Sequence, residues 1–469
     1  MKRRTKIVCT LGPAVGSREG IRGLIESGMN VARINCSHGD WESRRQWIKW
    51  IRELSPKVAP IAILVDLQGP KFRIGELAPE GLELVPNQTV TVGLGEVDIP
   101  IHQQEIVHAM SGGGRLLLGD GEIELRLMPG NGECFEAKVI SGGLLKSRKG
   151  VTLVGKVFDV PAITEKDRED AREALSLGID ILALSYVRHA QDVGELRAIV
   201  DEYDPRVAVC AKIEMRQGIQ ELDSILRVVD VVMVARGDMG LQMDIEDVPI
   251  MQKRIIRACS EASIPVITAT QMLESMINSP RPTRAEATDV ANAVLDGTDA
   301  IMLSGETSVG NYPFDCVKTM ARIAEKAETL YDRTKIEGQF QHRSVTGISQ
   351  TEAIAHSVSE LARVLRPNSI LTLSSSGQTP RLVSKYRPKA PILCATPNDR
   401  TFHQLAVVWG VDAIKVEEPT STDHAFSSAI LGFREEKRLK LGDMVIVTAG
   451  IPVGQPGNTN LIWAQVIKE

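Results

Sequence analysis

Short apolar runs rich in Val, Ile, Leu and Ala recur along the first two-thirds of the chain. Each is nearly uninterrupted in its apolar part, which is typical of strands buried on both faces of a parallel sheet. The runs lie at residues 6–12, 30–37, 61–69, 179–186, 207–214, 229–238, 264–272 and 299–306. The pattern therefore predicts eight strands.

Most segments between these runs have helical periodicity, as at 18–27, 247–263 and 284–297. The segment 164–178 opens with Thr164, a good N-cap residue, has Asp167 in its first turn and ends at Gly178. Eight strands alternating with helices predict an α/β fold of the (β/α)8 TIM-barrel type. An open doubly wound sheet is the alternative, but such sheets usually have fewer strands.

The alternation is interrupted once, between the third and fourth strands. Residues 71–160 combine alternating strands with Gly-rich turns, which predicts a small antiparallel β domain inserted in a βα loop. An insert at this position would lie over the C-terminal mouth of the barrel and could act as a lid. After a polar linker at 333–347, a helix at 351–365 and five further strands predict a second α/β domain. We thus expect a barrel of residues 1–70 and 161–335, a lid of 71–160 and a C-terminal domain of 345–469.

The composition limits the kinds of partner that the protein is expected to bind and indicates its cellular compartment. The net charge of −5 argues against general binding to nucleic acid or to an anionic membrane. The seven cysteines are scattered without a C-x-x-C pair, as expected for buried free thiols in a reducing compartment. No run approaches the roughly 20 apolar residues of a membrane span, and the N-terminal apolar stretch is too short for a signal peptide. We expect a cytoplasmic protein that acts on small molecules.

Polar residues gather where the predicted strands end, and active sites of (β/α)8 barrels lie at the C-terminal ends of the strands. A single charge after a strand is more often a solvated loop residue than a functional one. Here six strands deliver such residues to one rim, which favours a shared site. These residues are Arg33, Asn35, Ser37 and His38, then Asp66 and Arg73, Lys212 and Glu214, Arg236 and Asp238, Thr268 and Thr270, and Ser304 and Glu306.

The residue types at this rim indicate metal-assisted phosphate chemistry. Glu214 and Asp238 suit Mg²⁺, which commonly takes one or two carboxylates together with substrate oxygens. Arg33, Lys212 and Arg73 suit a phosphorylated substrate. Lys212 and Glu214 are two residues apart in one strand and therefore point the same way. We expect Glu214 to bind the metal and Lys212 to meet the charge of a moving phosphoryl group.

Several long strings resemble the pyruvate kinase family: "TKIVCTLGPA" (5–14), "GMNVARINCSHG" (28–39), "VMVARGDMG" (232–240), the stretch 268–307 beginning "TATQMLES", and "PGNTNLI" (456–462). The resemblance covers essentially the whole chain. It implies a catalytic barrel, a β lid inserted after the third strand and a C-terminal regulatory domain. It also implies transfer of the phosphoryl group of phosphoenolpyruvate to ADP, giving pyruvate and ATP in the final step of glycolysis.

Carried over residue by residue, the resemblance assigns roles to the rim. Lys212, Arg33, Arg73 and Thr270 would be catalytic, and Glu214 and Asp238 would bind Mg²⁺, for which Mn²⁺ is an alternative. Substrate would contact Arg33, Lys212, Gly237, Asp238 and Thr270; the nucleotide would contact Asn35, Ser37, His38, Arg73 and Lys149. Thr270 with ordered water is the candidate to protonate the enolate, and Ser304 with Glu306 is the weaker one.

One departure concerns K⁺, which many members of the family require. Its ligands would correspond to Asn35, Ser37, Asp66 and residue 67, but Leu67 offers no hydroxyl. Lys71 stands where K⁺-dependent members carry Glu, and its ammonium is a compact point charge that could replace the ion. The chain therefore resembles the K⁺-independent branch, and we expect activity without K⁺. The plainer interpretation is that Lys71 is a solvated hinge residue.

In the C-terminal domain, a Ser-rich turn separates a strand from a helix start. Backbone N–H groups and hydroxyls there could hold an anion, and the family uses this loop for a phosphorylated allosteric effector. The residues are Ser374, Ser375, Ser376, Gly377 and Thr379, with Arg381 and Lys385 nearby. The family is typically homotetrameric. Two other classes stay open: another Mg²⁺-dependent barrel enzyme such as a lyase, and a catalytically inactive metabolite sensor.

Overall fold

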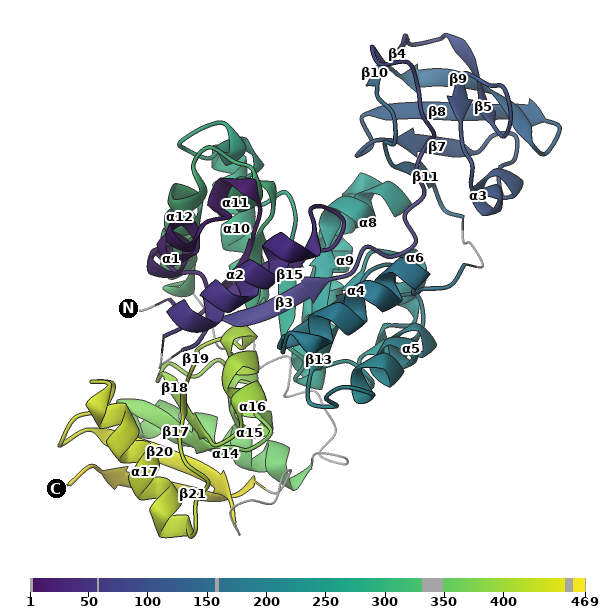
Figure 1. The fold of residues 1–469 in the computed structure, drawn as a ribbon. Coiled ribbons are helices and arrows are strands. Elements are labelled where there is room, and N and C mark those ends of the chain that lie inside the picture. Colours follow the sequence, from purple (N-terminus) through teal and green to yellow (C-terminus); the bar gives the residue numbers. More distant parts are fainter. Residues whose placement is uncertain (1–2, 57–58, 157–159, 331–348, 452–458, 469) are drawn as a thin grey trace.

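The computed structural model describes residues 3–56, 59–156, 160–330, 349–451 and 459–468. Figure 1 shows three bodies in a row, with the inserted β domain at one end, the barrel in the middle and the C-terminal domain at the other end. The predicted linker at 333–347 lies outside the described residues.

Eight parallel strands close into a barrel, in the order β1-β16-β15-β14-β13-β12-β3-β2. Each predicted strand is present, somewhat shorter than its apolar run, and the predicted fold class is confirmed. The strands are β1 (Lys6–Thr10), β2 (Val31–Asn35), β3 (Ala62–Asp66), β12 (Ile181–Leu184), β13 (Ala208–Ile213), β14 (Val231–Ala235), β15 (Val266–Ala269) and β16 (Ala300–Leu303).

The continuous apolar runs arise because both faces of these strands are buried. In β1, Val8 packs among the residues inside the barrel, whereas Ile7 and Cys9 pack against the surrounding helices. Successive side chains of a strand point to opposite faces, so each residue needs an apolar side chain.

Helices and short 3₁₀ turns surround the barrel. They are η1 (Pro13–Val15), α1 (Arg18–Ser27), α2 (Trp41–Leu54), α4 (Glu165–Ser176), α5 (Ala190–Asp201), α6 (Arg216–Gln220), α7 (Leu222–Ile225), α8 (Arg236–Gln242), η2 (Ile245–Asp247), α9 (Val248–Ala262), η3 (Glu274–Ile277), α10 (Arg284–Asp296), α11 (Gly305–Ser308) and α12 (Pro313–Glu328). Sequence signals set their ends. Thr164 and Asp167 form a reciprocal capping box at α4, and Gly28 ends α1 in the left-handed conformation.

The inserted domain is a β structure whose strands pair antiparallel, as predicted, except that β6 pairs parallel with β5. A six-stranded sheet has the order β11-β7-β8-β9-β5-β6, and β4 pairs with β10. Its elements are β4 (Leu82–Leu84), β5 (Thr89–Gly93), β6 (Ile99–Pro100), α3 (Gln104–His108), β7 (Arg115–Leu118), β8 (Ile123–Gly130), β9 (Cys134–Ser141), β10 (Gly143–Leu145) and β11 (Val151–Leu153). Where the chain leaves and re-enters the insert, its two connections pair through an Arg73–Gly150 bridge and an Ile74 N–H bond to the Lys149 carbonyl oxygen.

The C-terminal domain has a five-stranded sheet in the order β19-β18-β17-β20-β21, in which β21 alone is antiparallel. Its elements are α14 (Gln350–Leu365), β17 (Ser369–Leu373), α15 (Gln378–Lys385), β18 (Ile392–Thr396), α16 (Asp399–Gln404), η4 (Leu405–Val407), β19 (Val411–Lys415), α17 (Thr422–Glu435), β20 (Met444–Gly450) and β21 (Thr459–Val466). Ala406 and Val407 of η4 belong to the same apolar cluster as Val8 inside the barrel. The C-terminal domain therefore packs on the end of the barrel where the strands begin, opposite the lid (Figure 1).

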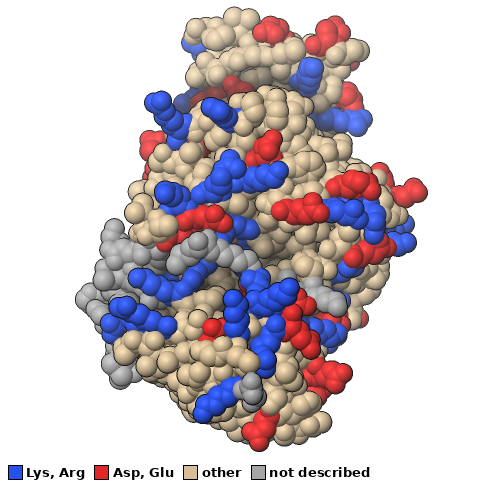
Figure 2. Space-filling view, turned by 90° about the vertical axis from the view of Figure 1, so that its left-hand side faces the viewer, with Lys and Arg blue, Asp and Glu red and all other residues tan. Residues whose placement is uncertain are grey.

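The surface in Figure 2 shows Lys and Arg interspersed with Asp and Glu, so this face carries no extended field of one sign. Within the described ranges, no helix is long and apolar enough to cross a membrane.

Candidate active site

Lys212, the last residue but one of β13, has its ammonium group enclosed at the C-terminal end of the barrel. Nζ donates to the Ser185 hydroxyl at 2.7 Å and lies 2.9 Å from Oε1 of Glu214 and 3.3 Å from Oδ1 of Asp66. All four side chains are buried. Three strands thus place one cation between two carboxylates.

Arg33 reaches the same cluster from β2. Its Nε and Nη2 donate to Oδ2 of Asp66 at 2.8 and 2.6 Å, and its Nη1 donates to the Thr10 hydroxyl at 2.9 Å. Asp66 therefore bridges Arg33 and Lys212, the two cations that the sequence assigned to phosphate. This bridge fixes both side chains before any ligand is present.

Mutual electrostatics hold Lys212 and Asp66 ionised. Burial by itself would lower the pKa of Lys212, but the carboxylates of Asp66 and Glu214 outweigh burial and raise that pKa. Burial would raise the pKa of Asp66, but Lys212 and Arg33 together lower it. Asp66 thus stays negative and Lys212 positive across the physiological range.

Glu214 combines one fixed oxygen with one that accepts no hydrogen bond. Oε2 accepts the backbone N–H of Tyr186 at 2.9 Å, whereas Oε1 faces Lys212 without hydrogen-bond geometry. Burial raises the pKa of Glu214, an effect that Lys212 partly offsets and Asp238 reinforces. A second negative charge thus stands beside Glu214, an arrangement that a divalent cation would relieve.

The donor set therefore fits a hard cation held by Glu214 and Asp238. Asp238 lies in α8 directly after β14 and is half-buried. In the described part of the chain, no group of three or more His, Cys, Asp or Glu side chains stands together as a metal site. A cation held here would therefore take its remaining ligands from substrate and water.

Thr270 follows β15 in a backbone conformation that its β-branched side chain rarely adopts. Thr270 and Gln271 have φ of 67° and 52°. The buried guanidinium of Arg236 holds the turn, donating to the carbonyl oxygens of Thr270 at 2.7 Å and Gln271 at 3.1 Å. The Thr270 hydroxyl accepts the Gly237 N–H at 2.8 Å. The Gly237 N–H that was predicted to hold substrate is therefore engaged by Thr270 in this state.

The residues assigned to nucleotide lie at the edge of the cluster. Asn35 accepts the Ser37 N–H at 3.0 Å, and His38 is exposed. Partial burial and the positive charges of Arg73, Lys71 and Arg33 lower the pKa of His38, which shows that cations gather here. Lys149 is exposed on the lid next to Gly150, the residue that pairs with Arg73. The connection to the inserted domain thus brings Arg73 to the mouth, and Lys149 lies on the strand connection that pairs with it.

Comparison with known proteins assigns the barrel and the C-terminal domain to the same family. Residues 2–317 match the family described as pyruvate kinase, barrel domain, and residues 352–463 match pyruvate kinase, alpha/beta domain. The chain belongs to the pyruvate kinase family. It is 43% identical to the pyruvate kinase of Geobacillus stearothermophilus over all of this chain and 81% of that relative. It is 42% identical to the pyruvate kinase of Bacillus licheniformis, over 99% of this chain and 80% of the relative. It is also 42% identical to pyruvate kinase 2 of Synechocystis, over 100% of this chain and 80% of the relative.

In the region that the sequence assigned to a monovalent cation, the one carboxylate already has partners within the chain. Oδ2 of Asp66 accepts from Arg33, Oδ1 lies 3.3 Å from Nζ of Lys212 without a hydrogen bond, and Leu67 is buried in the apolar core. Lys71 lines a cavity between lid and barrel together with Tyr186 and Asp238. Lys71 therefore lies at the same mouth as Asp238.

Of the two other proton-relay candidates, Ser304 and Glu306, the carboxylate of Glu306 has structural partners, whereas the buried Ser304 hydroxyl makes no hydrogen bond with the described residues. Glu306 is fully buried and accepts the backbone N–H groups of Leu273 at 3.0 Å and Ser304 at 2.7 Å. It thereby ties β16 to the turn after Thr270, which explains its burial without a role in proton transfer.

The Ser-rich turn leads directly into the N-terminus of α15. Gly377 has φ of 77° and precedes α15, and its N–H is accepted by the Ser374 hydroxyl at 2.9 Å. Thr379 pairs with Thr459 at 2.7 Å. Lys385, which the sequence places near this turn, is buried against Glu352 of α14 and the Glu261 carbonyl oxygen of α9, at 2.7 and 2.9 Å. It therefore contacts both its own domain and the barrel.

Sequence reasoning missed two residues of the site, Ser185 and Tyr186. Both follow β12, and Tyr186 has φ of 56°, which turns its N–H toward Glu214. The Ser185 hydroxyl donates to the Leu67 carbonyl oxygen at 2.8 Å, so its lone pairs face Lys212. The rule of polar residues at strand ends, applied to "ALSY", would have found them.

Proposed function

We propose that this chain is a phosphotransferase that moves the phosphoryl group of phosphoenolpyruvate to ADP, giving pyruvate and ATP as the final step of glycolysis. Membership of the pyruvate kinase family supports this. The observation that carries it at the site is the Lys212 ammonium, held between Glu214 and Asp66 beside Arg33. Phosphoryl transfer requires positioning and charge neutralisation, which this cluster supplies.

The roles follow from the placement of each group. Lys212 and Arg33 neutralise charge on the phosphoryl oxygens, and Arg73 and Lys149 add charge from the lid hinge. Glu214 and Asp238 hold Mg²⁺, or Mn²⁺ in its place, and the bound cation would neutralise phosphate oxygens. Asn35, Ser37 and His38 face the nucleotide. Thr270, with Gly237 and Asp238, orients the substrate, and its hydroxyl is our candidate to pass the proton that the enolate needs.

We also propose that K⁺ is not required, because Lys71 supplies a positive charge at the mouth and Leu67 offers no ligand. Turnover in a K⁺-free buffer should be near maximal. Strong activation by added K⁺ would show that Lys71 is only a solvated hinge residue.

The remaining assignments follow the family. We propose three domains (residues 1–70 with 161–335, 71–160, and 345–469), a homotetrameric assembly and a cytoplasmic location. We propose that Ser374, Ser375, Ser376, Gly377 and Thr379 bind a phosphorylated allosteric effector.

A coupled assay for pyruvate tests the main proposal. Pyruvate should form only when phosphoenolpyruvate, ADP and Mg²⁺ are all present. Pyruvate formed without ADP from another substrate would indicate a lyase. No turnover, together with retained binding of phosphoenolpyruvate, would indicate a metabolite sensor.

A further inference from the structure

Tyr186, which follows β12, is held in a backbone conformation that is costly for its residue type. Its φ is 56°, a left-handed value that aromatic residues rarely adopt. The turned N–H donates to Oε2 of Glu214 at 2.9 Å, which fixes the backbone beside a carboxylate that we assign to Mg²⁺. Residues held in such conformations gather at functional sites. Because any residue but proline could donate this N–H, the contact explains the turn but not the tyrosine side chain.

The aromatic ring of Tyr186 lies against Gly69, in the segment that follows β3. A Cβ atom at residue 69 would lie 2.9 Å from Cδ2 of Tyr186 and 2.9 Å from Cβ of Ser185, so a glycine is needed for the ring to approach. The Gly69 N–H donates to Oδ1 of the buried Asp167 at 3.1 Å, which anchors this segment. The ring therefore rests on a fixed stretch of backbone.

Tyr186 also lines the cavity between the lid and the barrel, together with Lys71, Gly150 and Asp238. This cavity measures about 50 Å³, whereas a single water molecule needs about 10–15 Å³. It has room for a few water molecules or for a small group of a larger ligand, such as the edge of a phosphate.

The hydroxyl of Tyr186 makes no hydrogen bond with any residue that the structure describes. Burial raises the pKa of Tyr186 well above its usual value, Asp238 and Glu214 raise it further, and Arg73 acts in the opposite direction. The phenol therefore keeps its proton at physiological pH, and it lies within the field of two carboxylates and one guanidinium. A neutral donor at this place calls for an oxygen acceptor when the site is filled.

Phosphate oxygens are the acceptors that best fit this position. A phosphate neutralised by a cation on Glu214 and Asp238, and by Arg73, would bring its oxygens among the charges that act on the phenol. Hydrogen bonds to an ionised acceptor are shorter than neutral ones and about twice as strong. An apolar group at the same place would leave the hydroxyl without a partner, which is unfavourable.

We propose that the Tyr186 hydroxyl donates a hydrogen bond to a phosphate oxygen of the nucleoside diphosphate. This contact adds a neutral donor to the cations Lys212, Arg33 and Arg73. The inference rests on the proposed function, in which both phosphoenolpyruvate and ADP bring a phosphate to the mouth. Arg73, which we assign to the nucleotide, is a cation that acts on the phenol, and this favours ADP as the source of the acceptor.

Tyr186→Phe tests the proposal, because it removes the hydroxyl and keeps both the ring and the N–H that Glu214 accepts. Calorimetric titration of the full chain with ADP, and separately with phosphoenolpyruvate, each with Mg²⁺ present, gives two dissociation constants. The Kd for ADP should increase about tenfold or more, as for a lost hydrogen bond to a charged group. The Kd for phosphoenolpyruvate should change less than about twofold. Circular dichroism should show a Tm within about 2 °C of wild type.

Tyr203→Phe is the matched control. Tyr203 is exposed, lies between α5 and the start of β13, and therefore stands at the end of the barrel opposite the mouth. Its hydroxyl also makes no hydrogen bond within the described part of the chain. This variant should bind both ligands as wild type does.

Equal Kd values for ADP in wild type and Tyr186→Phe would overturn the inference, and so would an equal loss in Tyr203→Phe. Weaker binding of phosphoenolpyruvate with unchanged binding of ADP would overturn the assignment to the nucleotide. The coupled pyruvate assay keeps this test apart from the proposed function. A wild-type protein that forms no pyruvate refutes the proposed function, whereas an active wild type with an unchanged KM for ADP in Tyr186→Phe refutes only the role of the hydroxyl.

Discussion

Replacing Lys212 by methionine removes the ammonium at the centre of the candidate active site and keeps most of the side chain's length. Nζ contacts Ser185, Glu214 and Asp66 at 2.7, 2.9 and 3.3 Å. The substitution leaves Asp66 paired with Arg33 and leaves Glu214 with the Tyr186 N–H. The perturbation is therefore mainly the loss of one buried positive charge.

The distances set the scale of the effect on stability. At an effective dielectric constant of about 20, a charge pair is worth about 6 kcal/mol at the Glu214 distance and about 5 kcal/mol at the Asp66 distance. Desolvating the ammonium opposes this by several kcal/mol. We expect a net loss of about 3 kcal/mol in the free energy of unfolding, in the range for breaking a buried pair. For a domain of this size, Tm should fall by about 6–12 °C, so the protein stays folded at room temperature.

The effect on turnover should be much larger. A single cation placed on a transferring phosphoryl group is worth about 10³-fold or more in kcat, or at least about 4 kcal/mol in the activation free energy. A lactate dehydrogenase-coupled assay measures kcat, and circular dichroism checks the fold and Tm. Lys253→Met is the matched control, because Lys253 is an exposed lysine on α9 paired with Asp296. If Lys212→Met retains kcat within tenfold of wild type, or if Lys253→Met loses as much, the assigned role is wrong.

Three further predictions follow from the same cluster. Asp66→Asn removes the charge shared by two buried cations and should lower the free energy of unfolding by about 3–5 kcal/mol in urea titration; a change below about 1 kcal/mol would contradict the bridge. Burial raises the pKa of Glu214, so the folded state favours the protonated carboxyl group. The stability that this preference contributes is fully present below the pKa of Glu214 in the unfolded chain, and it is lost as the pH rises through the pKa of Glu214 in the folded protein. Because metal requires the ionised form, the Kd for Mn²⁺, followed by electron paramagnetic resonance, should increase as pH falls from about 8 to 6. A Kd independent of pH, or Glu214→Gln binding as tightly as wild type, would refute this. Arg236→Lys keeps the charge but loses bonds to the turn at Thr270, and should lower kcat/KM for phosphoenolpyruvate about 10²-fold; unchanged kcat/KM would show that the turn holds itself.

The sequence predicted where the candidate active site lies and which residue types it contains, but not how those residues contact one another. Polar residues at the ends of β2, β3, β13 and β14 do gather at one mouth, because parallel strands in a closed barrel all end on the same side. The sequence did not show which of these residues pair with one another. Asp66 bridges Arg33 and Lys212 only because barrel closure aligns β3 with β2 and β12 and brings β13 within reach.

Local sequence patterns also did not predict the backbone conformation of the turns or the direction of individual side chains. The left-handed backbone at Thr270 and Tyr186 conflicts with the preference of both residue types and persists because Arg236 and Glu214 bind the turned backbone. Lys385 lies near the Ser-rich turn in the sequence, but the packing of α15 against α14 directs its ammonium to Glu352.

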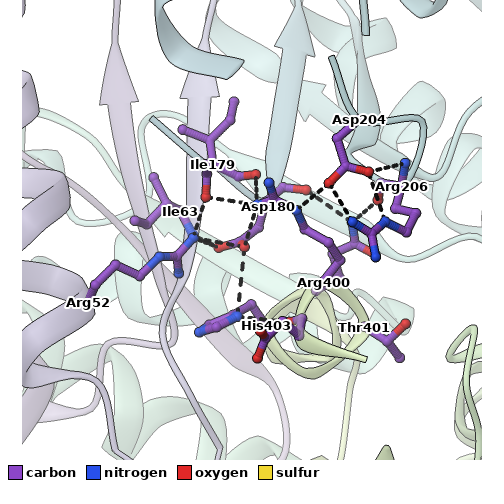
Figure 3. Close-up of polar contacts among 12 residues, drawn as sticks. Arg52, Ile63, Ile179, Asp180, Asp204, Arg206, Arg400, Thr401 and His403 are labelled. Carbon is purple, nitrogen blue, oxygen red and sulfur yellow. Dashed lines mark hydrogen bonds and ion pairs between the residues drawn. The ribbon is translucent and has the colours of Figure 1, made fainter. Parts of the chain in front are cut away.

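The order of apolar and polar residues is enough to specify the barrel, the inserted β domain and the C-terminal α/β domain, because the period of the side chains encodes which face of each strand and helix is buried. Only the assembled fold shows how charges neutralise one another at the mouth and that Arg400 of the C-terminal domain pairs with Asp204 of the barrel (Figure 3). Those contacts join residues far apart in the chain, such as Asp204 and Arg400, and depend on register and docking that no local pattern contains.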